Sequence, residues 1–419
     1  MNYPDSVHFL YALGNEIKTT KLGLDRIRCL LEGLGNPDRQ SRFVHVAGTN
    51  GKGSTCAMIE SALRAHGEKT GLFTSPHLSE PTERIQVSRT AIAAERFAGA
   101  FDRVHACVES LIRTGAIDMH TSYFETVTAM AFLVFAEARL DRVVLEVGLG
   151  GRLDATNVVS PELCVITPID FDHEAYLGRS LEAIAGEKAG ILKPGVPAVF
   201  ARQRPEARAV LLDRARALEI PVTRAEDLEL RDLSLDARGS RFTLGGHLQI
   251  RCPLAGEHQV ENAVAAAAAL LALGIPKAAI EAGIAAARWP GRLELVSTNP
   301  EMVLDGAHNP AGARALAAYI DRFYSGRRVR LIFGAMRDKA IAEIAGILFP
   351  RADQVIVTAP RQARAFSPEA MHGIAAHPNL TIAPRIEDAL ALVRGAGPDD
   401  VIFVTGSLFL VAEARALLS

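Results

Sequence analysis

Cysteine is scarce in this chain of 419 residues, and no two cysteines stand close together. The five are Cys29, Cys56, Cys107, Cys164 and Cys252, and none forms a C-x-x-C pair. Disulfide frameworks and structural zinc sites use closely spaced cysteines, so the sequence argues against both and fits a reducing compartment.

The chain also lacks an excess of charge of either sign, with 46 Lys plus Arg against 48 Asp plus Glu. Nucleic acid and anionic membranes attract proteins with a basic surplus, so neither is an expected partner. The longest apolar run, Ala263 to Ile275, has 13 residues, which is typical of a buried helix and short for a membrane span.

An apolar core of the kind found in signal peptides is absent near the N-terminus. The residues there include Asp5, His8, Glu16 and Lys18. We therefore expect a cytoplasmic protein.

The length predicts two domains rather than one core. Apolar β-branched runs at 43–47, 142–147, 163–167 and 196–200 alternate with helical patterns at 54–66, 94–113, 124–139 and 206–217. This alternation predicts an α/β fold with a mostly parallel sheet covered by helices on both faces. Short alternating segments at 226–252 predict a small antiparallel β piece.

A second βα series follows a break at Trp289-Pro290-Gly291. Its strand candidates lie at 302–305, 329–333, 354–358 and 400–404. We predict a first domain over 1–292 and a smaller Rossmann-like α/β domain over 293–419, with a ligand site in the cleft between them.

Residues 44–55 read VHVAGTNGKGST, an apolar run followed by a glycine-rich turn with Lys52 and by hydroxyl residues. Gly48, Gly51 and Gly53 allow close backbone approach, and amides at a helix N-terminus favour an anion. A Walker A loop would have Gly at position 46 and Ser or Thr at 53, where this chain has Val and Gly. The pattern predicts a P-loop-like polyphosphate site; the alternative is a glycine-rich turn whose Lys is only buried or solvated.

Two charged side chains stand where burial would be costly. Glu146 lies in the segment LEVGLGGRLDATN (145–157), within the apolar strand at its start. A buried carboxylate there needs a cation as its partner, either Mg²⁺ or the side chain of Arg152. Lys188 lies in GEKAGILKPG (186–195), on a short helix of small residues. It therefore reaches solvent, is paired, or is covalently modified.

Further polar groups follow apolar runs, where open α/β sheets place ligands. The strings are TSPHL (74–78) with ERI (83–85), PIDFDHEAYLG (168–178) with His173, GEHQVENA (256–263) with His258 and Asn262, Arg292, and LDGAHNP (304–310) with Asp305, His308 and Asn309. A turn or a solvated His explains any one of them. Only GEHQVENA, Arg292 and LDGAHNP cluster near the break at 290–298, and this clustering favours a nucleotide contact there.

Together these strings resemble the folylpolyglutamate synthase and dihydrofolate synthase family, of the bifunctional bacterial type, within the Mur ligase superfamily. GTNGKGS, TSPHL, EVGLGGRLDATN, DH-x-x-x-LG, EKAGI, GEHQ-x-x-NA, PGRLE and DGAHNP occur in that order. The Gly after the Lys is the family's form of the loop. The resemblance implies an ATP-dependent ligase that joins L-glutamate to dihydropteroate or to the glutamate tail of a folate, through an acyl phosphate.

For the nucleotide, the resemblance implies that Thr49, Asn50, Gly51, Lys52, Gly53 and Ser54 hold the ATP phosphates. Asn262, Arg292 and Asp305 would also hold the nucleotide, and Asp305 and His308 would lie near the incoming glutamate.

For the metal, the resemblance implies that Ser75 and Glu146 bind one Mg²⁺ and that His173 binds a second ion. Lys188 would be carbamylated by CO₂, which turns its cation into an anion that faces the metal. K⁺ is an additional candidate cofactor. The expected catalytic residues are then Lys52, Lys188, His173, Asp305 and His308.

For the folate, the resemblance implies a loop in which Phe124 packs against the pterin ring. The expected substrate residues are Lys21, Leu22, Arg84, Ser122, Tyr123, Phe124, Glu125, Leu153, Asp154 and Ala155. A further substrate residue, Ser407 in the TGSLF turn, would line the pocket of the nucleotide and the incoming glutamate.

The resemblance also gives the two domains their roles. Residues 1–292 become an ATP-binding Mur-ligase-like domain with the folate site, and 293–419 a domain of the glutamate-ligase type. Rotation about 290–298 would close the site and exclude water from the acyl phosphate. We expect a monomer with small-molecule substrates only.

Two other functions stay open at this point. A Mur-type or other amino-acid ligase would act on a different carboxylate, but Mur ligases carry a UDP-binding domain before the loop, and 47 residues precede Gly48 here. A nucleotide-binding regulatory module without catalysis would need none of Glu146, His173 and Lys188.

Overall fold

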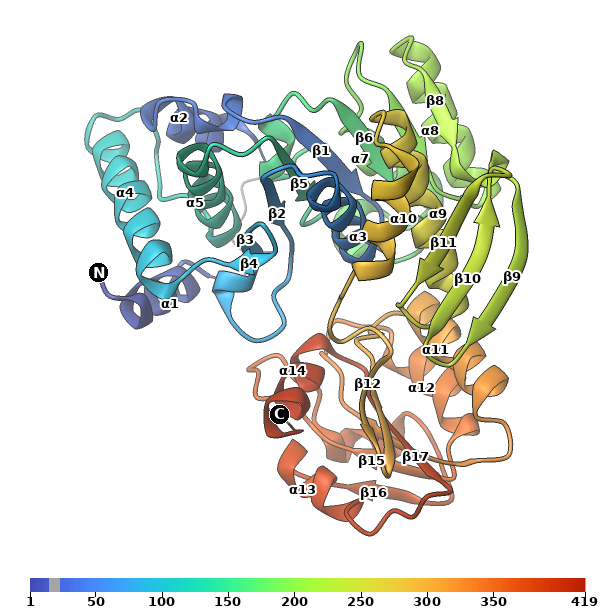
Figure 1. The fold of residues 1–419 in the computed structure, drawn as a ribbon. Coiled ribbons are helices and arrows are strands. Elements are labelled where there is room, and N and C mark those ends of the chain that lie inside the picture. The colour runs from blue at the N-terminus through green and yellow to red at the C-terminus, as the bar shows by residue number, and fades with distance from the viewer. Residues whose placement is uncertain (15–22, 419) are drawn as a thin grey trace. The chain divides into compact units, whose positions relative to one another are not determined.

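The computed structural model describes residues 1–14 and 23–418 and forms two compact units (Figure 1). The first unit comprises Met1–Glu229 and Glu261–Ala286, and the second comprises Leu230–Val260 and Ala287–Ser419. The division therefore falls inside helix α9 (Glu257–Ala272).

An eight-stranded sheet organises the first unit, in the order β4-β3-β2-β5-β1-β6-β7-β8. Its strands are β1 (Phe43–Ala47), β2 (Thr70–Phe73), β3 (Ile85–Val87), β4 (Thr90–Ala91), β5 (Arg142–Glu146), β6 (Leu163–Ile166), β7 (Ala198–Phe200) and β8 (Val222–Arg224). Only β3 and β4 run antiparallel to their neighbours. The apolar runs on β1, β5 and β6 are buried throughout, which is typical of central parallel strands.

Helices cover both faces of this sheet (Figure 1). They are α1 (Tyr3–Ala12), α2 (Asp25–Gly33), α3 (Lys52–Ala65), α4 (Ala94–Arg113), α5 (Tyr123–Ala138), α6 (Glu174–Leu177), α7 (Leu181–Ala189), α8 (Pro205–Ala217) and α10 (Lys277–Ala286). Helix α3 packs against α10, where Gly283 meets the backbone of Ala62 so closely that a Cβ would lie 2.1 Å from the Ala62 Cα atom.

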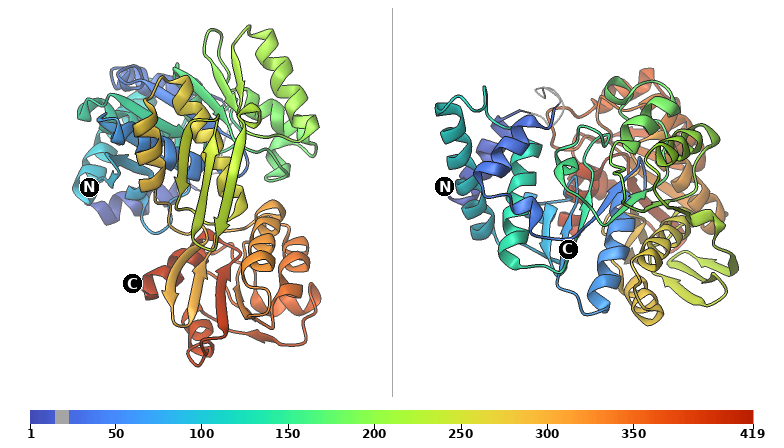
Figure 2. Two further views of the ribbon diagram at one scale, coloured as in Figure 1. Left: turned by 45° about the vertical axis from the view of Figure 1, so that its right-hand side comes forward. Right: turned by 90° about the horizontal axis from the view of Figure 1, so that it is seen from above.

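The second unit contains two sheets. A three-stranded antiparallel sheet is formed by β9 (Leu230–Asp236), β10 (Gly239–Leu244) and β11 (Leu248–Cys252), and Figure 2 shows it in yellow-green. A six-stranded sheet has the order β12-β13-β17-β14-β15-β16, and all of its pairs are parallel except β12–β13. Its strands are β12 (Glu294–Thr298), β13 (Glu301–Leu304), β14 (Arg328–Phe333), β15 (Gln354–Val357), β16 (Leu380–Ile382) and β17 (Asp400–Thr405).

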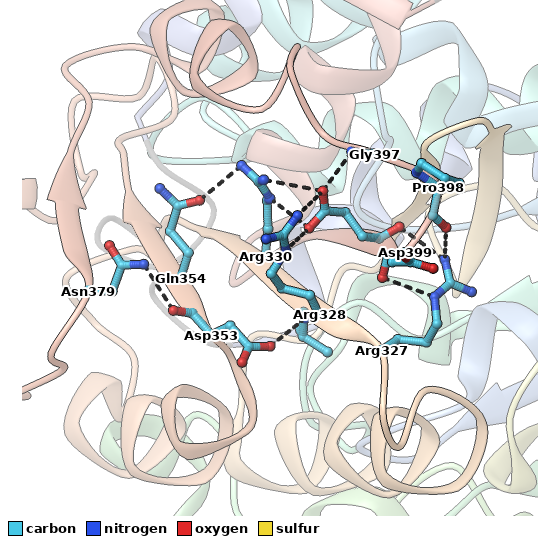
Figure 3. Close-up of polar contacts among 11 residues, drawn as sticks. Arg327, Arg328, Arg330, Asp353, Gln354, Asn379, Gly397, Pro398 and Asp399 are labelled. Atoms are coloured by element: carbon cyan, nitrogen blue, oxygen red, sulfur yellow. Dashed lines mark hydrogen bonds and ion pairs between the residues drawn. The ribbon is translucent and has the colours of Figure 1, made fainter.

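Four helices belong to the six-stranded sheet: α11 (Pro310–Phe323), α12 (Ile341–Leu348), α13 (Ile386–Leu392) and α14 (Leu408–Leu418). At one end of the sheet the buried Asp400 carboxylate accepts hydrogen bonds from Arg328 and Arg330. The neighbouring Arg327 donates to the carbonyl groups of Pro398 and Asp399 (Figure 3). This network ties the first residues of β14 to the turn before β17.

The predicted α/β class, the mostly parallel sheet, the antiparallel piece and the second α/β unit are all present. The strands that the sequence does not predict, such as β4 and β16, are short or lie at sheet edges. Such strands have too few residues to show a recognisable hydrophobic pattern. In the described part of the chain, no helix combines the length and apolarity needed to span a bilayer.

The grouping of residues 230–260 differs from the expected division at residue 292. The structure places them with the second unit, because the Tyr319 hydroxyl donates to the Ala237 carbonyl group over 2.7 Å and Ala255 joins the same apolar core as Leu293. The residues that make these contacts are far apart in sequence. The alternating pattern of 226–252 therefore predicts the strands but does not predict which unit they pack against.

Candidate functional site

The glycine-rich segment forms the turn between β1 and α3. Gly48 and Gly51 have φ values of 149° and 83°, and α3 begins at Lys52. The N–H groups of Lys52, Gly53 and Ser54 lie in the first helical turn, where the helix itself offers no acceptor. An anion at this position would meet these amides and the positive end of the helix dipole.

Two of the loop amides are already used within the protein. The N–H groups of Thr49 and Asn50 both donate to the Pro168 carbonyl oxygen, over 3.0 and 3.2 Å. The Thr49 hydroxyl donates to the Asp170 carbonyl oxygen over 3.0 Å. The segment after β6 thus holds the loop in shape, and the N–H groups of Thr49 and Asn50 are already engaged within the protein.

Lys52 and Asn262 complete the loop. The Lys52 ammonium donates to the Thr49 carbonyl oxygen over 3.2 Å, so its charge stays over the turn. Asn262 on α9 lies against Gly51, since a Cβ there would be 2.1 Å from the Asn262 Oδ1 atom. The structure therefore brings Gly51 and Asn262, two expected nucleotide residues, together.

Lys188 lies in α7 and points into the protein. It is 4% exposed, and its ammonium nitrogen donates to the Gly48 carbonyl oxygen over 2.8 Å. Burial and the nearby Lys52 charge lower the pKa of Lys188 to about 7, against the opposing effect of Asp172 and Asp154. The alternative in which Lys188 reaches solvent is wrong.

Glu146 is the last residue of β5, beside Val46 of β1. The carboxylate is buried and accepts a hydrogen bond from the Ser75 N–H group over 3.2 Å. The Ser75 hydroxyl is buried and has no hydrogen-bond partner among the described residues. Arg152 pairs instead with Glu187, over 2.8 Å, so a salt bridge to Arg152 does not account for the buried carboxylate.

Two aspartates shape the segments around Lys188. Asp154 accepts hydrogen bonds from the amides of Leu149 and Thr156, over 2.8 and 3.0 Å, and burial raises its pKa. Asp172 lies beside His173, with 3.8 Å between the Asp172 Oδ1 and His173 Nε2 atoms. His173 has a φ of 52° and is the N-cap residue of α6, so its backbone is in the left-handed conformation.

Arg292, Asp305, His308 and Ser407 lie in the second unit. Asp305 is buried after β13 and accepts from the amides of Leu293 and Ala307, over 2.9 and 3.0 Å. Burial raises its pKa, and the nearby Arg292 opposes that shift.

The neighbouring loops of the second unit approach the same place. A Cβ on Gly306 would lie 2.3 Å from a guanidinium nitrogen of Arg292, and the Gly406 amide donates to the Ala307 carbonyl oxygen over 3.1 Å. His308 Nδ1 lies 2.8 Å from the Gly306 carbonyl oxygen. The four expected residues therefore come from loops that contact one another at the ends of β13 and β17.

The expected folate residues have mixed surroundings. Ser122 and Glu125 form a capping box at the start of α5, and Glu125 also pairs with Arg26 over 3.2 Å. Phe124 lies against Gly148, where a Cβ would be 2.5 Å from its ring. Lys21 and Leu22 lie outside the described residues.

Arg84 is buried beside Tyr123 and makes a cation–π contact with it, in which the Arg84 Cζ atom lies 5.0 Å from the centroid of the Tyr123 ring. Leu153 is partly buried, Ala155 is buried, and the Asp154 carboxylate accepts hydrogen bonds within its own loop.

Sequence reasoning missed His77 as a partner of Arg84. Its Nδ1 atom accepts a hydrogen bond from the Arg84 Nε–H group over 2.9 Å, and burial lowers its pKa to about 3. It also missed Pro168, whose role rests on a backbone carbonyl group and therefore leaves no side-chain signal.

Known protein families match both units. The Mur ligase middle domain matches residues 46–270, and the Mur ligase, glutamate ligase domain matches residues 291–408. A dihydrofolate synthase/folylpolyglutamate synthase of Bacillus subtilis is 36% identical over 412 residues, covering 95% of each chain.

Solved structures agree with these matches. A Mycobacterium tuberculosis folylpolyglutamate synthase, complexed with ADP and AMPPCP, has a TM-score of 0.92 and 33% identity, covering 100% of this chain and 99% of that chain. Escherichia coli FolC, in complex with DHPP and ADP, has a TM-score of 0.88 and 31% identity, covering 100% and 98%. The chain therefore belongs to the folylpolyglutamate synthase and dihydrofolate synthase family of Mur-type, ATP-dependent ligases.

Proposed function

We propose that this chain joins L-glutamate to dihydropteroate, to the glutamate tail of a tetrahydrofolate, or to both, with hydrolysis of ATP to ADP. The contact between buried Lys188 and the first glycine of the phosphate loop carries the proposal, because a phosphate-binding fold alone would not need it. The full-length similarity to enzymes named for these reactions supports the choice of substrates.

For ATP, we assign the phosphates to the loop Thr49–Ser54. The amides after Asn50, the α3 dipole and the Lys52 ammonium would stabilise the negative charge that moves during phosphoryl transfer. Phosphorylation converts the substrate carboxylate into an acyl phosphate, which has a good leaving group. The glutamate amine then attacks the acyl carbon, the amide bond forms and phosphate leaves.

The residues around Glu146 fit Mg²⁺. The buried Glu146 carboxylate and the buried Ser75 hydroxyl are hard oxygen donors of the kind this ion prefers, and the hydroxyl has no hydrogen-bond partner among the described residues. We assign Ser75 and Glu146 to one ion and His173 to a second, with K⁺ as a further candidate cofactor. When bound, Mg²⁺ would neutralise phosphate charge.

We propose that Lys188 reacts with CO₂ to give a carbamate. The neutral amine is the reactive form, and burial favours it near pH 7. The neutral amine nitrogen bonds to the carbon of CO₂ and releases one proton, so a neutral group becomes an anion. Starting from the ammonium form, two protons are released in all. An anionic group there would be compatible with a second cation beside Asp172 and His173.

On the substrate side, we assign Phe124 to the pterin ring and Asp305 with His308 to the glutamate. Phe124 borders the glycine loop 148–151, close to β5 and its Glu146. Ser122 and Glu125 would act by fixing the start of α5, since both side chains already cap that helix.

The test measures glutamate-dependent ADP release with dihydropteroate and then with tetrahydrofolate. Release with one substrate identifies a single activity, and release with both identifies a bifunctional enzyme. Release with neither contradicts the proposal and leaves a ligase for another carboxylate or a regulatory module.

We also propose a cytoplasmic monomer. The five cysteines are all free, which suits a reducing compartment. Light scattering of the purified chain tests the oligomeric state, and a mass twice that of one chain would contradict it.

A further inference from the structure

A cluster of two histidines and one glutamate lies away from the phosphate loop, in the first unit. His105 and Glu109 come from α4, one helical turn apart, and His120 comes from the segment that joins α4 to α5. One ligand atom from each of the three lies within 4.8 Å of the other two.

The distance between the two rings suits a shared metal ion. His105 Nδ1 lies 3.3 Å from His120 Nε2. Two nitrogen ligands bound to zinc at about 2.1 Å in a tetrahedral arrangement would lie about 3.4 Å apart. The exposed Glu109 carboxylate would be the third ligand, and a water molecule would take the open position.

The second ring nitrogen of His120 is positioned as metal sites require. His120 Nδ1 lies 2.9 Å from the Thr121 carbonyl oxygen, to which it donates its proton. The lone pair is then on Nε2, which faces His105. A backbone carbonyl group that holds the other nitrogen of a ligating histidine is a recurring feature of metal sites.

Aromatic rings hold the cluster in place. The His105 ring stacks on the Phe101 ring, with 5.6 Å between their centroids and an interplanar angle of 8°. The ring centroid of Phe9 in α1 lies 4.8 Å from that of His105 and 5.5 Å from that of His120. The histidines are partly buried and Glu109 is exposed, so an ion has a path from solvent.

We propose that His105, Glu109 and His120 form a binding site for one Zn²⁺-like divalent transition metal ion. Imidazole nitrogens together with a carboxylate select such metals over Mg²⁺. The ion would tie α4 to His120, two residues before the Ser122 cap of α5. Its role would be to stabilise the connection before the proposed folate loop, and the reaction itself would not use it.

The alternative is that His105 donates a hydrogen bond to His120 without any metal. A titration of EDTA-treated protein with ZnCl₂, measured by calorimetry, distinguishes the two arrangements. Excess Mg²⁺ is present throughout, so that the proposed magnesium sites are filled. We expect one Zn²⁺ per chain at this site and a rise in the melting temperature.

Matched variants assign the binding to the cluster. His120→Gln and Glu109→Gln should weaken it at least about tenfold, whereas His66→Gln, at an exposed histidine after α3, should not. Glu109 is exposed, so its variant keeps the fold testable if His120→Gln is unstable.

Cobalt provides a second readout. Co²⁺ bound in wild-type protein should give visible absorption bands typical of four-coordinate nitrogen and oxygen ligation, and these bands should be missing in His120→Gln. Equal Zn²⁺ affinity and stoichiometry in wild type, His120→Gln and Glu109→Gln would overturn the proposal, as would the absence of Zn²⁺ binding to folded wild-type protein.

Discussion

The ammonium nitrogen of Lys188 lies 2.8 Å from the carbonyl oxygen of Gly48, so a buried amine touches the first glycine of the phosphate loop. Gly48 is itself packed closely, since a Cβ there would lie 1.8 Å from the Thr167 hydroxyl. The loop is therefore held from two sides, by α7 and by the segment after β6. Any change in the charge of Lys188 therefore acts directly beside the loop that we propose binds the ATP phosphates.

The stability of the protein should rise with pH because of Lys188. Its pKa is lowered to about 7 in the folded state from 10.5, so the unfolded chain binds the extra proton between these values. In CO₂-free buffer this group should add up to about 1.4 kcal/mol to the unfolding free energy for each pH unit from 7 to 10. Urea unfolding of wild type and Lys188→Met measures it, and identical pH dependence in both would contradict the shift.

Carbamylation predicts a ¹³C signal that depends on Lys188. Protein equilibrated with ¹³C-bicarbonate should show a carbamate resonance in its ¹³C spectrum, and Lys188→Arg should lack it. The arginine stays charged and cannot take the carbamate role, so turnover should fall at least about 100-fold. Lys277→Arg, at an exposed helix position paired with Glu281, is the control and should keep both the resonance and the turnover.

Replacing Glu146 tests the magnesium assignment. Glu146→Ala should lower turnover at least about 100-fold, because one oxygen ligand is lost beside the phosphates. Glu137→Ala, which removes an exposed carboxylate of α5 paired with Arg103, should change turnover little. Full turnover in Glu146→Ala, measured as ADP release over a range of Mg²⁺ concentrations, would remove the residue from the metal site.

A methyl group on Gly51 should weaken nucleotide binding. It would meet the Asn262 side chain at 2.1 Å, at a φ of 83° that favours glycine. Gly67→Ala separates these effects, since Gly67 has a φ of 94° and an added Cβ would meet no heavy atom of the described residues within 4 Å, its two chain neighbours aside. We expect Gly51→Ala to lose at least about tenfold in ADP affinity and Gly67→Ala to lose only about 1–2 kcal/mol of stability. Calorimetry with ADP checks both, and unchanged affinity in Gly51→Ala would contradict this placement of the loop.

Asp400 should stabilise the second unit in a pH-dependent way. The hydrogen bond from Arg328 lowers the pKa of this buried carboxylate, so its contribution is complete above about pH 4 and is lost as the pH falls further. Asp400→Asn should cost about 2 kcal/mol at neutral pH, and the difference from wild type should shrink in acid. The surroundings are drawn in Figure 3.

The matched control for that experiment is Asp388→Asn. Asp388 pairs with Arg385 on the exposed side of α13, over 3.4 Å, and such a pair contributes at most about 1 kcal/mol. A cost for Asp400→Asn no larger than that of Asp388→Asn would show that the arginine network contributes nothing measurable.

The sequence by itself determined the fold class, the family and the chemistry-bearing residue types. Strand β1 and helix α4 are predicted at their observed bounds, because an unbroken apolar run and a 3.6-residue period are local properties of the chain. The loop around Lys52 is likewise local, since its glycines and its lysine are neighbours in sequence.

Only the tertiary structure decided which distant groups meet. It placed Lys188 on Gly48, turned Arg152 toward Glu187 and joined Tyr319 to Ala237, and none of these pairs has a spacing that a sequence pattern contains. It also made Pro168 a support of the loop through a carbonyl group that every residue type possesses. Partner choice in a packed interior depends on shape, burial and backbone geometry, which are properties of the folded chain as a whole.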